Sequence, residues 1–245
     1  NVVRQRKYSR NPDIRGLRIM LLGDSAKMPL RKEYIADLEK LKVDVQKMGE
    51  LAKDSARNAI TALVQRDREL ASRILKENVT IDDLEFDIEN RCMKLIALQQ
   101  PMAVNLRTIG KCMKIITDFD RISDLAGDIA EIVLQIAEEP HVKPLIDIPR
   151  MSEISQGMLS DCLEAFSTGE IKMLDDFSDR DDEIDALFDQ IRRELITILI
   201  EKPRGFTNAS HLNFVALHLE RIGDHACNIA SRIIYMVTGK RRKLE

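Results

Sequence analysis

Two stretches of eleven residues decide the fold of this chain: Asp120-Arg-Ile-Ser-Asp-Leu-Ala-Gly-Asp-Ile-Ala130 and Glu220-Arg-Ile-Gly-Asp-His-Ala-Cys-Asn-Ile-Ala230. They stand 100 positions apart, and six of the eleven residues are identical. Self-similarity at a fixed spacing indicates that one structural unit has been duplicated. We therefore interpret the chain as a tandem duplication of a unit of about 90 to 100 residues.

The duplication extends upstream of these stretches, where apolar residues recur at steps of three and four. This spacing marks one face of an amphipathic helix. The first set is Ile81, Leu84, Ile88, Cys92 and Leu95, and the second, displaced by 103 positions, is Ile184, Leu187, Ile191, Leu195 and Ile198. No strict apolar alternation competes with this pattern, so the sequence predicts helices rather than strands.

The predicted fold is all-α: a tandem duplication of an up-down three-helix bundle. Short connectors make consecutive helices antiparallel neighbours. The expected helices are about 31–65, 80–99 and 103–138 in the first repeat, and 148–168, 183–200 and 206–238 in the second. We expect the first repeat to occupy 28–139 and the second 140–245, joined through Pro140, Pro144 and Pro149.

Residues 1–27 do not belong to the duplicated unit. They are basic, whereas the net charge of the whole chain is −3. We expect an extension derived from cloning or from translation of an upstream segment, with Met28 as the natural start. A functional basic arm is the alternative.

Composition excludes several classes of protein. Hydrophobic residues make up 44% of the chain, aromatic residues 4%, and there is no Trp, which is typical of aliphatic helix packing. The body beyond the basic N-terminus is acidic, which argues against nucleic-acid binding because phosphate neutralisation needs clustered Lys and Arg. The four cysteines lack metal-binding or disulfide spacing, so we expect buried thiols in a reducing cytoplasm.

Carboxylates form a stripe on each predicted third helix, roughly opposite the apolar sector. The stripe residues are Asp120, Asp124 and Asp128 in the first repeat and Glu220, Asp224 and Asn228 in the second. Like charges four residues apart repel, unless a cation offsets them. Oxygen ligands on adjacent turns suit hard ions, so the stripes predict a metal site.

The carboxylate stripes and two other sets of polar residues also allow simpler, structural interpretations. Arg121 and Arg221 could pair with the aspartates three residues later, which would make the stripe a solvated helix face. Asp82 and Asp185 match across the repeats, but we interpret them as residues of the first helical turn. A ladder of histidines borders the apolar sector of the last helix, and partly buried or interface positions are expected for its members, His211, His218 and His225.

The paired motifs resemble those of the PhoU family. The resemblance rests on both third-helix stretches, on Gln100-Pro-Met-Ala-Val-Asn-Leu-Arg107 and on Met48-Gly49-Glu50, and it covers about residues 31–238. The chain departs from the family pattern at Asp120 and Asp128, where Glu and Asn are frequent, and at Ser123, where Gly is frequent.

The resemblance implies a cytoplasmic regulator of phosphate uptake that represses the phosphate-starvation response and meets the membrane only peripherally. It implies contacts with the ATPase subunit of the phosphate ABC transporter and with a sensor histidine kinase, and we also expect a homodimer. It further implies that Asp120, Asp124, Glu220 and Asp224, flanked by Asp128 and Asn228, bind metal ions: iron, or Mn, Mg or Zn.

Catalytic signatures are missing from the sequence: no GxGxxG, GxxxxGK[ST], HExxH or GxSxG occurs. We therefore expect a protein that is not an enzyme. Two alternatives remain open. One is a metal-dependent hydrolase or oxidase that uses the carboxylate stripes. The other is a scaffold without metal whose stripes dock a basic partner.

Overall fold

The computed structural model describes residues 14–99 and 101–244, with the side chains of 33–98 and 101–244. Within these residues the chain forms six α-helices and two short 3-10 helices, and no strand, which confirms the all-α prediction. The helices are α1 (Ile14–Gln65), α2 (Arg68–Gln99), α3 (Ala103–Ile136), α4 (Asp147–Thr168), η1 (Lys172–Leu174), α5 (Phe177–Glu201), η2 (Pro203–Gly205) and α6 (Phe206–Thr238).

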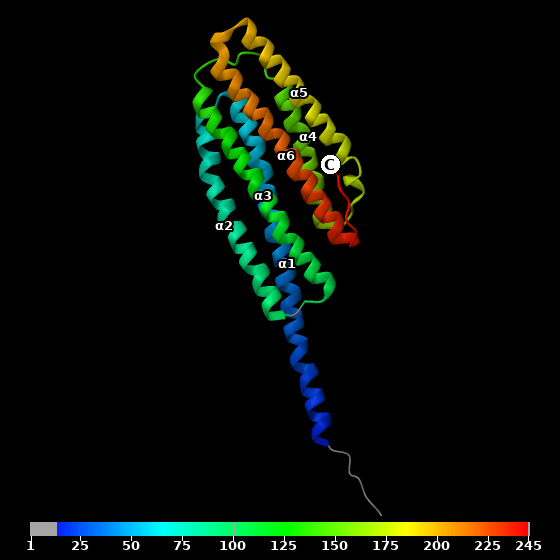
Figure 1. Ribbon diagram of the computed structural model, residues 1–245. Helices are drawn as coiled ribbons and strands as arrows, with labels where there is room; N and C mark the ends of the chain where they lie inside the picture. Colours follow the sequence, from blue (N-terminus) through cyan, green and yellow to red (C-terminus); the bar gives the residue numbers. More distant parts are fainter. Residues whose placement is uncertain (1–13, 100, 245) are drawn as a thin grey trace, which may run out of the picture.

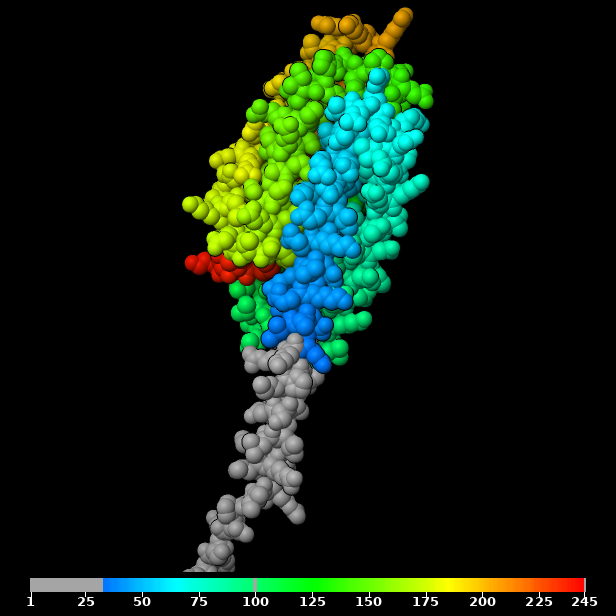
Figure 2. Space-filling model, turned by 180° about the vertical axis from the view of Figure 1, so that it is seen from behind, coloured from blue at the N-terminus to red at the C-terminus, as the bar shows by residue number. Residues whose placement is uncertain are grey.

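The helices form two three-helix bundles, as the duplication predicts. Helices α1, α2 and α3 pack together, and so do α4, α5 and α6. The bundles join along two lines: α3 packs on α6, and α1 packs on α4. Figure 1 shows α3 and α6 side by side in the middle with α2 and α5 at the outer edges, and Figure 2 shows α1 beside α4 on the opposite face.

The apolar sectors predicted for the third helices form the centre of the core. Each of their ten members is 1% exposed or less. They are Ile115, Ile122, Ala126, Ile129 and Val133 in α3, and Val215, Ile222, Ala226, Ile229 and Ile233 in α6. Burial of aliphatic side chains at this density supplies most of the stability of such a bundle, at about 25 cal/mol per Å² of apolar surface.

The second helix of the first repeat is longer than predicted, and the prediction that it starts near residue 80 is wrong. Helix α1 ends at Gln65, Arg66 takes a left-handed conformation with φ 55°, and α2 begins at Arg68. Asp67 Oδ1 accepts hydrogen bonds from the backbone N–H groups of Glu69 and Leu70, each 2.9 Å long. This N-cap satisfies the first orphan donors of α2, so the helix starts three turns earlier.

Helix α1 also exceeds its prediction. It begins at Ile14 rather than near residue 31 and passes through Pro29. Of the predicted extension 1–27, residues 1–13 lie outside the described part, and 14–27 continue α1. A proline removes one intrahelical hydrogen bond and strains the preceding turn, but a long helix can continue past it.

The two repeats differ between their first and second helices. In the second repeat α4 ends at Thr168, where Gly169 takes φ 78° as the C-cap, and the 3-10 helix η1 separates it from α5. Helix α5 therefore spans 25 residues where α2 spans 32. Helix α5 begins at Phe177, six residues before its predicted start at 183, so that prediction is wrong as well. Helices α3, α4 and α6 begin and end within about two residues of their predicted bounds.

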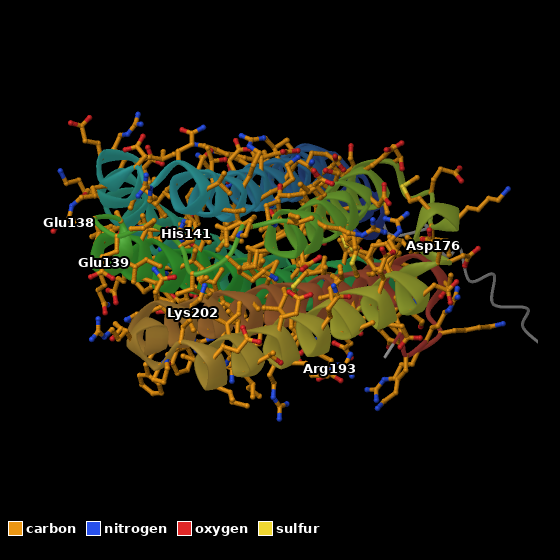
Figure 3. All side chains as sticks on the ribbon, turned by 90° about the horizontal axis from the view of Figure 1, so that it is seen from above. Glu138, Glu139, His141, Asp176, Arg193 and Lys202 are labelled. Atoms are coloured by element: carbon orange, nitrogen blue, oxygen red, sulfur yellow. The ribbon has the colours of Figure 1, made fainter. Side chains whose placement is uncertain are left out.

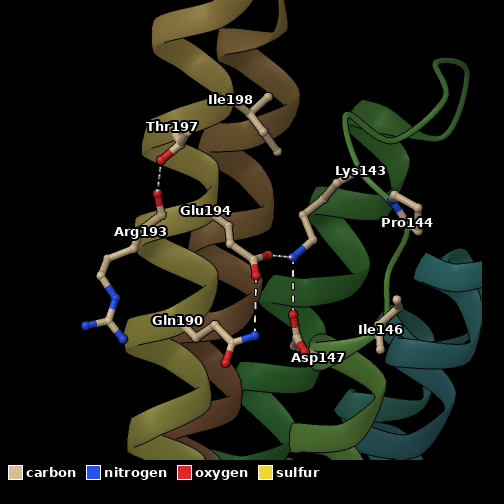
Figure 4. A pocket seen from close by; sticks show the side chains of 9 residues that line it. All are labelled: Lys143, Pro144, Ile146, Asp147, Gln190, Arg193, Glu194, Thr197 and Ile198. Carbon is tan, nitrogen blue, oxygen red and sulfur yellow. Dashed lines mark hydrogen bonds and ion pairs between the residues drawn. The ribbon is translucent and has the colours of Figure 1, made fainter.

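The connector between the repeats spans residues 137–146 and contains the predicted boundary at 139/140. Glu138, Glu139 and His141 lie at this end of the bundle (Figure 3), and His141 Nε2 lies 3.0 Å from the carbonyl oxygen of Leu63. Lys143 forms ion pairs with Asp147 and Glu194 beside a cavity of about 610 Å³ (Figure 4). These contacts fasten the connector to α1, α4 and α5.

No helix among the described residues is both long and apolar enough to cross a membrane.

All four cysteines are buried, as predicted, and burial raises the pKa of the thiols of Cys92 and Cys112 to about 12. They therefore act as small apolar side chains of the core.

Candidate functional site

The first-repeat carboxylates gather where α3 faces α2. The pKa of Asp120 is raised to about 6, first by burial and then by the neighbouring carboxylates of Glu85, Asp124 and Asp82. Asp82 and Glu85 belong to α2, so negative charge from two helices meets at one seam. Each carboxylate there makes ionisation of the others more costly, which favours a bound cation.

The second repeat has a corresponding seam between α6 and α5. Burial raises the pKa of Glu220, and the carboxylates of Asp224 and Asp185 act in the same direction. Asp185 on α5 also has a raised pKa, caused first by burial and then by Asp182 and Asp189. The two repeats therefore share one electrostatic feature: an acidic seam between the second and third helix.

The interpretation of Asp82 and Asp185 as residues of a first helical turn is wrong. Helix α2 begins at Arg68 and α5 at Phe177, so both aspartates lie well inside their helices. Both contribute to the seams, by raising the pKa of Asp120 and of Glu220. Their place in the seams could have been suspected from the sequence, because Asp82 and Asp185 are 103 positions apart, as are the helices that carry them.

The last residue of each stripe has a different surrounding. Asp128 Oδ2 lies 4.0 Å from His218 Nδ1, so this aspartate contacts α6. Asn228 Nδ2 donates a hydrogen bond to the backbone oxygen of Asp224 within its own helix. The structure thus places three of the six predicted residues on α3 and three on α6, with Asp128 facing the other repeat.

The ion-pair interpretation holds in part for the first repeat. Arg121 Nη1 lies 2.9 Å from Asp124 Oδ2, and both side chains are at least half exposed. An exposed pair of this kind contributes about 0.3 kcal/mol, which leaves Asp124 available to a competing cation. Its presence therefore does not remove the charge that surrounds Asp120.

The carboxylates of the seams are not arranged as a complete metal-coordination site. Among residues 33–98 and 101–244, no three His, Cys, Asp or Glu side chains converge closely enough to hold a metal ion. The donors are carboxylate oxygens, whose chemistry suits hard cations. Side-chain rotation on the two facing helices would be needed to bring them around one ion.

A polar groove of about 460 Å³ runs beside the first seam, between α2, α3 and α6. Its lining includes Asn78, Arg121, Asp124, Asp128, Arg221 and His225. Asn78 joins three helices, because its Oδ1 accepts from Ser55 Oγ at 3.2 Å and its Nδ2 donates to the Ser123 backbone oxygen at 2.9 Å. This bridge holds α2 against α3 at the groove.

His211 is partly buried, and His218 and His225 lie at the interface between the repeats, as predicted. Burial lowers the pKa of both. His225 Nδ1 lies 3.1 Å from Asp118 Oδ1, and Arg232 pairs with the same buried carboxylate. Asp118, which is 4% exposed, thus ties α3 to α6. In the sequence Asp118 aligns with the histidine ladder across the repeats, and no role was predicted for it.

Comparison with known proteins agrees with both the repeat and the fold. A family model described as the PhoU domain matches twice, at residues 45–133 and 148–233. A phosphate-specific transport system accessory protein PhoU homolog from Aquifex aeolicus is 42% identical over 83% of this chain and 92% of that protein. A homolog of the same name from Caulobacter vibrioides is 37% identical over 85% of this chain and 91% of its own length.

Solved structures give the same result. PhoU from Pseudomonas aeruginosa superposes with a TM-score of 0.81 at 30% identity, over 84% of this chain and 100% of the other. The phosphate transport system regulatory protein PhoU from Streptococcus pneumoniae gives a TM-score of 0.79 at 28% identity, over 86% and 99%. With two domain matches, one on each three-helix bundle, the chain belongs to the PhoU family.

Proposed function

We propose that this chain is a non-enzymatic accessory protein of a phosphate-specific transport system. The observation that carries the proposal is the double PhoU-domain match, which covers both bundles and includes both acidic seams. The names of the relatives, phosphate-specific transport system accessory proteins, support the same role.

In this proposal the protein acts in the cytoplasm by contact. Its partners are the ATPase subunit of the phosphate ABC transporter and the sensor histidine kinase, and it works as a homodimer. When phosphate is plentiful it limits uptake and keeps the kinase from activating the starvation response. The absence of a membrane-crossing helix among the described residues is compatible with a peripheral position at the membrane.

Deletion of the gene tests this role. In phosphate-rich medium the deletion strain should show raised phosphatase expression and raised phosphate uptake, and the full-length gene should restore both to the wild-type level. Unchanged expression and uptake would reject the proposal. Purified transporter and kinase, mixed with the protein in a sedimentation experiment, then test the two contacts separately.

We further propose that the two seams bind hard metal ions: iron, or Mn, Mg or Zn. Asp120 and Asp124 with Asp82 would hold the ion in the first repeat, and Glu220, Asp224 and Asp185 in the second. A bound cation would supply positive charge that stabilises carboxylates whose ionisation is otherwise opposed. Asp128 and Asn228 would flank the two sites.

A matched pair of variants tests the metal. Asp124 pairs with Arg121 at 2.9 Å and Asp54 pairs with Arg57 at 2.8 Å, both three residues apart on an exposed helix face. Metal should raise the melting temperature of the wild type and of Asp54→Asn, and raise that of Asp124→Asn less, because stabilisation grows as RT ln(1 + [L]/Kd). An equal rise in melting temperature in all three proteins would reject metal binding at the seam and favour a metal-free scaffold. Elemental analysis of protein purified without a tag or chelator identifies the ion.

A further inference from the structure

The outer face of α2 carries a row of large apolar side chains that no other described helix covers. Val79, Phe86 and Met93 follow one another at intervals of seven residues and are 58%, 66% and 55% exposed. Seven residues are close to two helical turns, so the three side chains lie along one line about 21 Å long. We call these three residues the α2 stripe.

Helix α2 contacts α1 and α3, and its core-facing residues point toward them. Ile81, Ile88 and Cys92 are each at most 2% exposed. At 100° per residue the α2 stripe lies on the side opposite these buried positions. Figure 1 shows α2 at an outer edge of the molecule, which leaves that side open to a partner.

Carboxylates flank the α2 stripe around its centre. Within one helical segment the sequence supplies five of them and no cation: Asp82, Asp83, Glu85, Asp87 and Glu89. The next cation, Arg91, pairs with Asp44 of α1 and is therefore turned toward the bundle. The open face of α2 thus combines an apolar row with a border that is negative around Phe86, while the exposed side chains of Lys76 and Lys94 lie beyond its two ends.

The second repeat lacks this surface. At the spacing of 103 residues, Asp182, Asp189 and Ile196 of α5 stand where the α2 stripe has Val79, Phe86 and Met93. The stripe is therefore not required by the three-helix bundle, which forms in the second repeat without it. An exposed apolar row that only one repeat carries is not explained by folding, and exposed apolar surfaces of this kind mark interaction sites.

We propose that the α2 stripe docks an amphipathic helix of a partner protein, with an apolar row that meets Val79, Phe86 and Met93 and with Lys or Arg on both flanks. The geometry is that of two helices packing side by side, in which apolar residues spaced by seven form the seam. Flanking charges set the choice of partner. A second copy of this chain fits poorly, because two such faces would bring their negative borders together.

That the partner helix belongs to a protein of the phosphate transport system rests on the proposed function. That the partner helix carries an apolar row with basic flanks rests only on the α2 stripe. The two statements are tested separately. The probe for the chemistry is a fluorescently labelled synthetic helix of about three heptads with Leu at the seam and Lys on the flanks, and its twin carries Glu in place of Lys. Measurements are made with the full chain in EDTA, so that metal does not change the charge of the seam.

The matched variants are Phe86→Ser and Phe206→Ser. Phe86 is 66% exposed and Phe206, on the second repeat, is 65% exposed, so the two changes remove the same side chain at the same exposure. We expect wild type and Phe206→Ser to bind the Lys peptide alike, and Phe86→Ser to bind it about tenfold more weakly with an unchanged melting temperature. The Glu peptide should not bind.

Equal weakening by both variants, no effect of Phe86→Ser, no binding of the Lys peptide, or equal binding of the Glu twin would each overturn the proposal. A wild-type dimer that Phe86→Ser dissociates in sedimentation would assign the face to a second copy and overturn it as well. The same variants are then tested on the purified transporter ATPase subunit and kinase. If neither binds the wild type, the proposed function fails, while the peptide result decides the docking chemistry.

Discussion

Gly49 lies in α1 where that helix meets both α3 and α4. A Cβ atom at this position would lie 2.5 Å from Phe119 Cζ and 2.5 Å from Leu163 Cδ2, and both of those side chains are buried. Gly49→Ala should therefore lower the free energy of unfolding by about 1 to 3 kcal/mol through overpacking. Gly110→Ala in α3, which meets nothing within 4 Å, should raise it by about 0.5 to 1 kcal/mol through helix propensity. Urea unfolding measures both, and similar effects at the two sites would contradict the close approach.

Asp120 gives the first seam a pH dependence. Its pKa is about 6 in the folded protein, against 3.8 for an unperturbed aspartate, so between these values the folded state binds more protons than the unfolded state. Stability in EDTA should therefore fall as pH rises from about 4 to about 6. Because Asp120 is only partly buried, we expect about 1 kcal/mol, which Asp120→Asn should remove. Chemical unfolding across this pH range measures the difference, and identical profiles for wild type and variant would refute it.

Of the residues in the two acidic seams, the sequence predicted those on the third helices only. The stripes on α3 and α6 follow from a helical period, which is visible in the order of the residues alone. Their partners on α2 and α5 do not, because the rotation of one helix against another depends on packing. Asp82 and Glu85 meet Asp120 only because α2 presents that side to α3. The repeat of Asp82 at Asp185 was visible, but its structural meaning was not.

Among the elements, the start of α2 depends on a single cap. Asp67 Oδ1 accepts two backbone hydrogen bonds of 2.9 Å at the start of the helix. Asp67→Ala should lower the free energy of unfolding by about 1 kcal/mol, whereas Asp67→Asn keeps an accepting oxygen and should cost much less. Thermal unfolding and hydrogen exchange of residues 68–72 compare the two variants. An equal loss in both would show that charge, rather than the cap, holds the helix start.

The helices that sequence analysis placed well are those with a strong apolar period and a proline or glycine at the ends. Helix α6 agrees with its predicted range, 206–238. Helix α2 does not, although Leu70, Ala71, Ile74 and Leu75 already follow a helical period in its first turns, and Ala71 and Ile74 are at most 1% exposed. The sequence therefore held a signal for the earlier start, together with the cap residue Asp67.

For the whole molecule, the α3–α6 interface is one of the two contacts that join the repeats, beside that of α1 with α4. Its buried polar centre is Asp118, which meets His225 at 3.1 Å and pairs with Arg232. The duplicated sequence carries His218 and Ile132 at the positions that correspond to Asp118 and Arg232, so this cluster has no counterpart within either repeat. It arises only when the two bundles pack together, which explains why it could not be derived from one repeat.

A double-mutant cycle tests the role of this cluster. Asp118→Leu leaves Arg232 partly buried without its carboxylate, and Arg232→Leu leaves the carboxylate with His225 alone, so each should lower the free energy of unfolding by about 3 kcal/mol. The double variant replaces the ion pair by apolar side chains and should recover to within about 1 kcal/mol of wild type. If the cluster also couples the bundles, each single variant should unfold in two separated transitions where the wild type shows one. Additive losses in the double variant would mean that Asp118 and Arg232 do not stabilise each other, and the joining of the repeats would then depend on the apolar contacts of α3 with α6 and of α1 with α4.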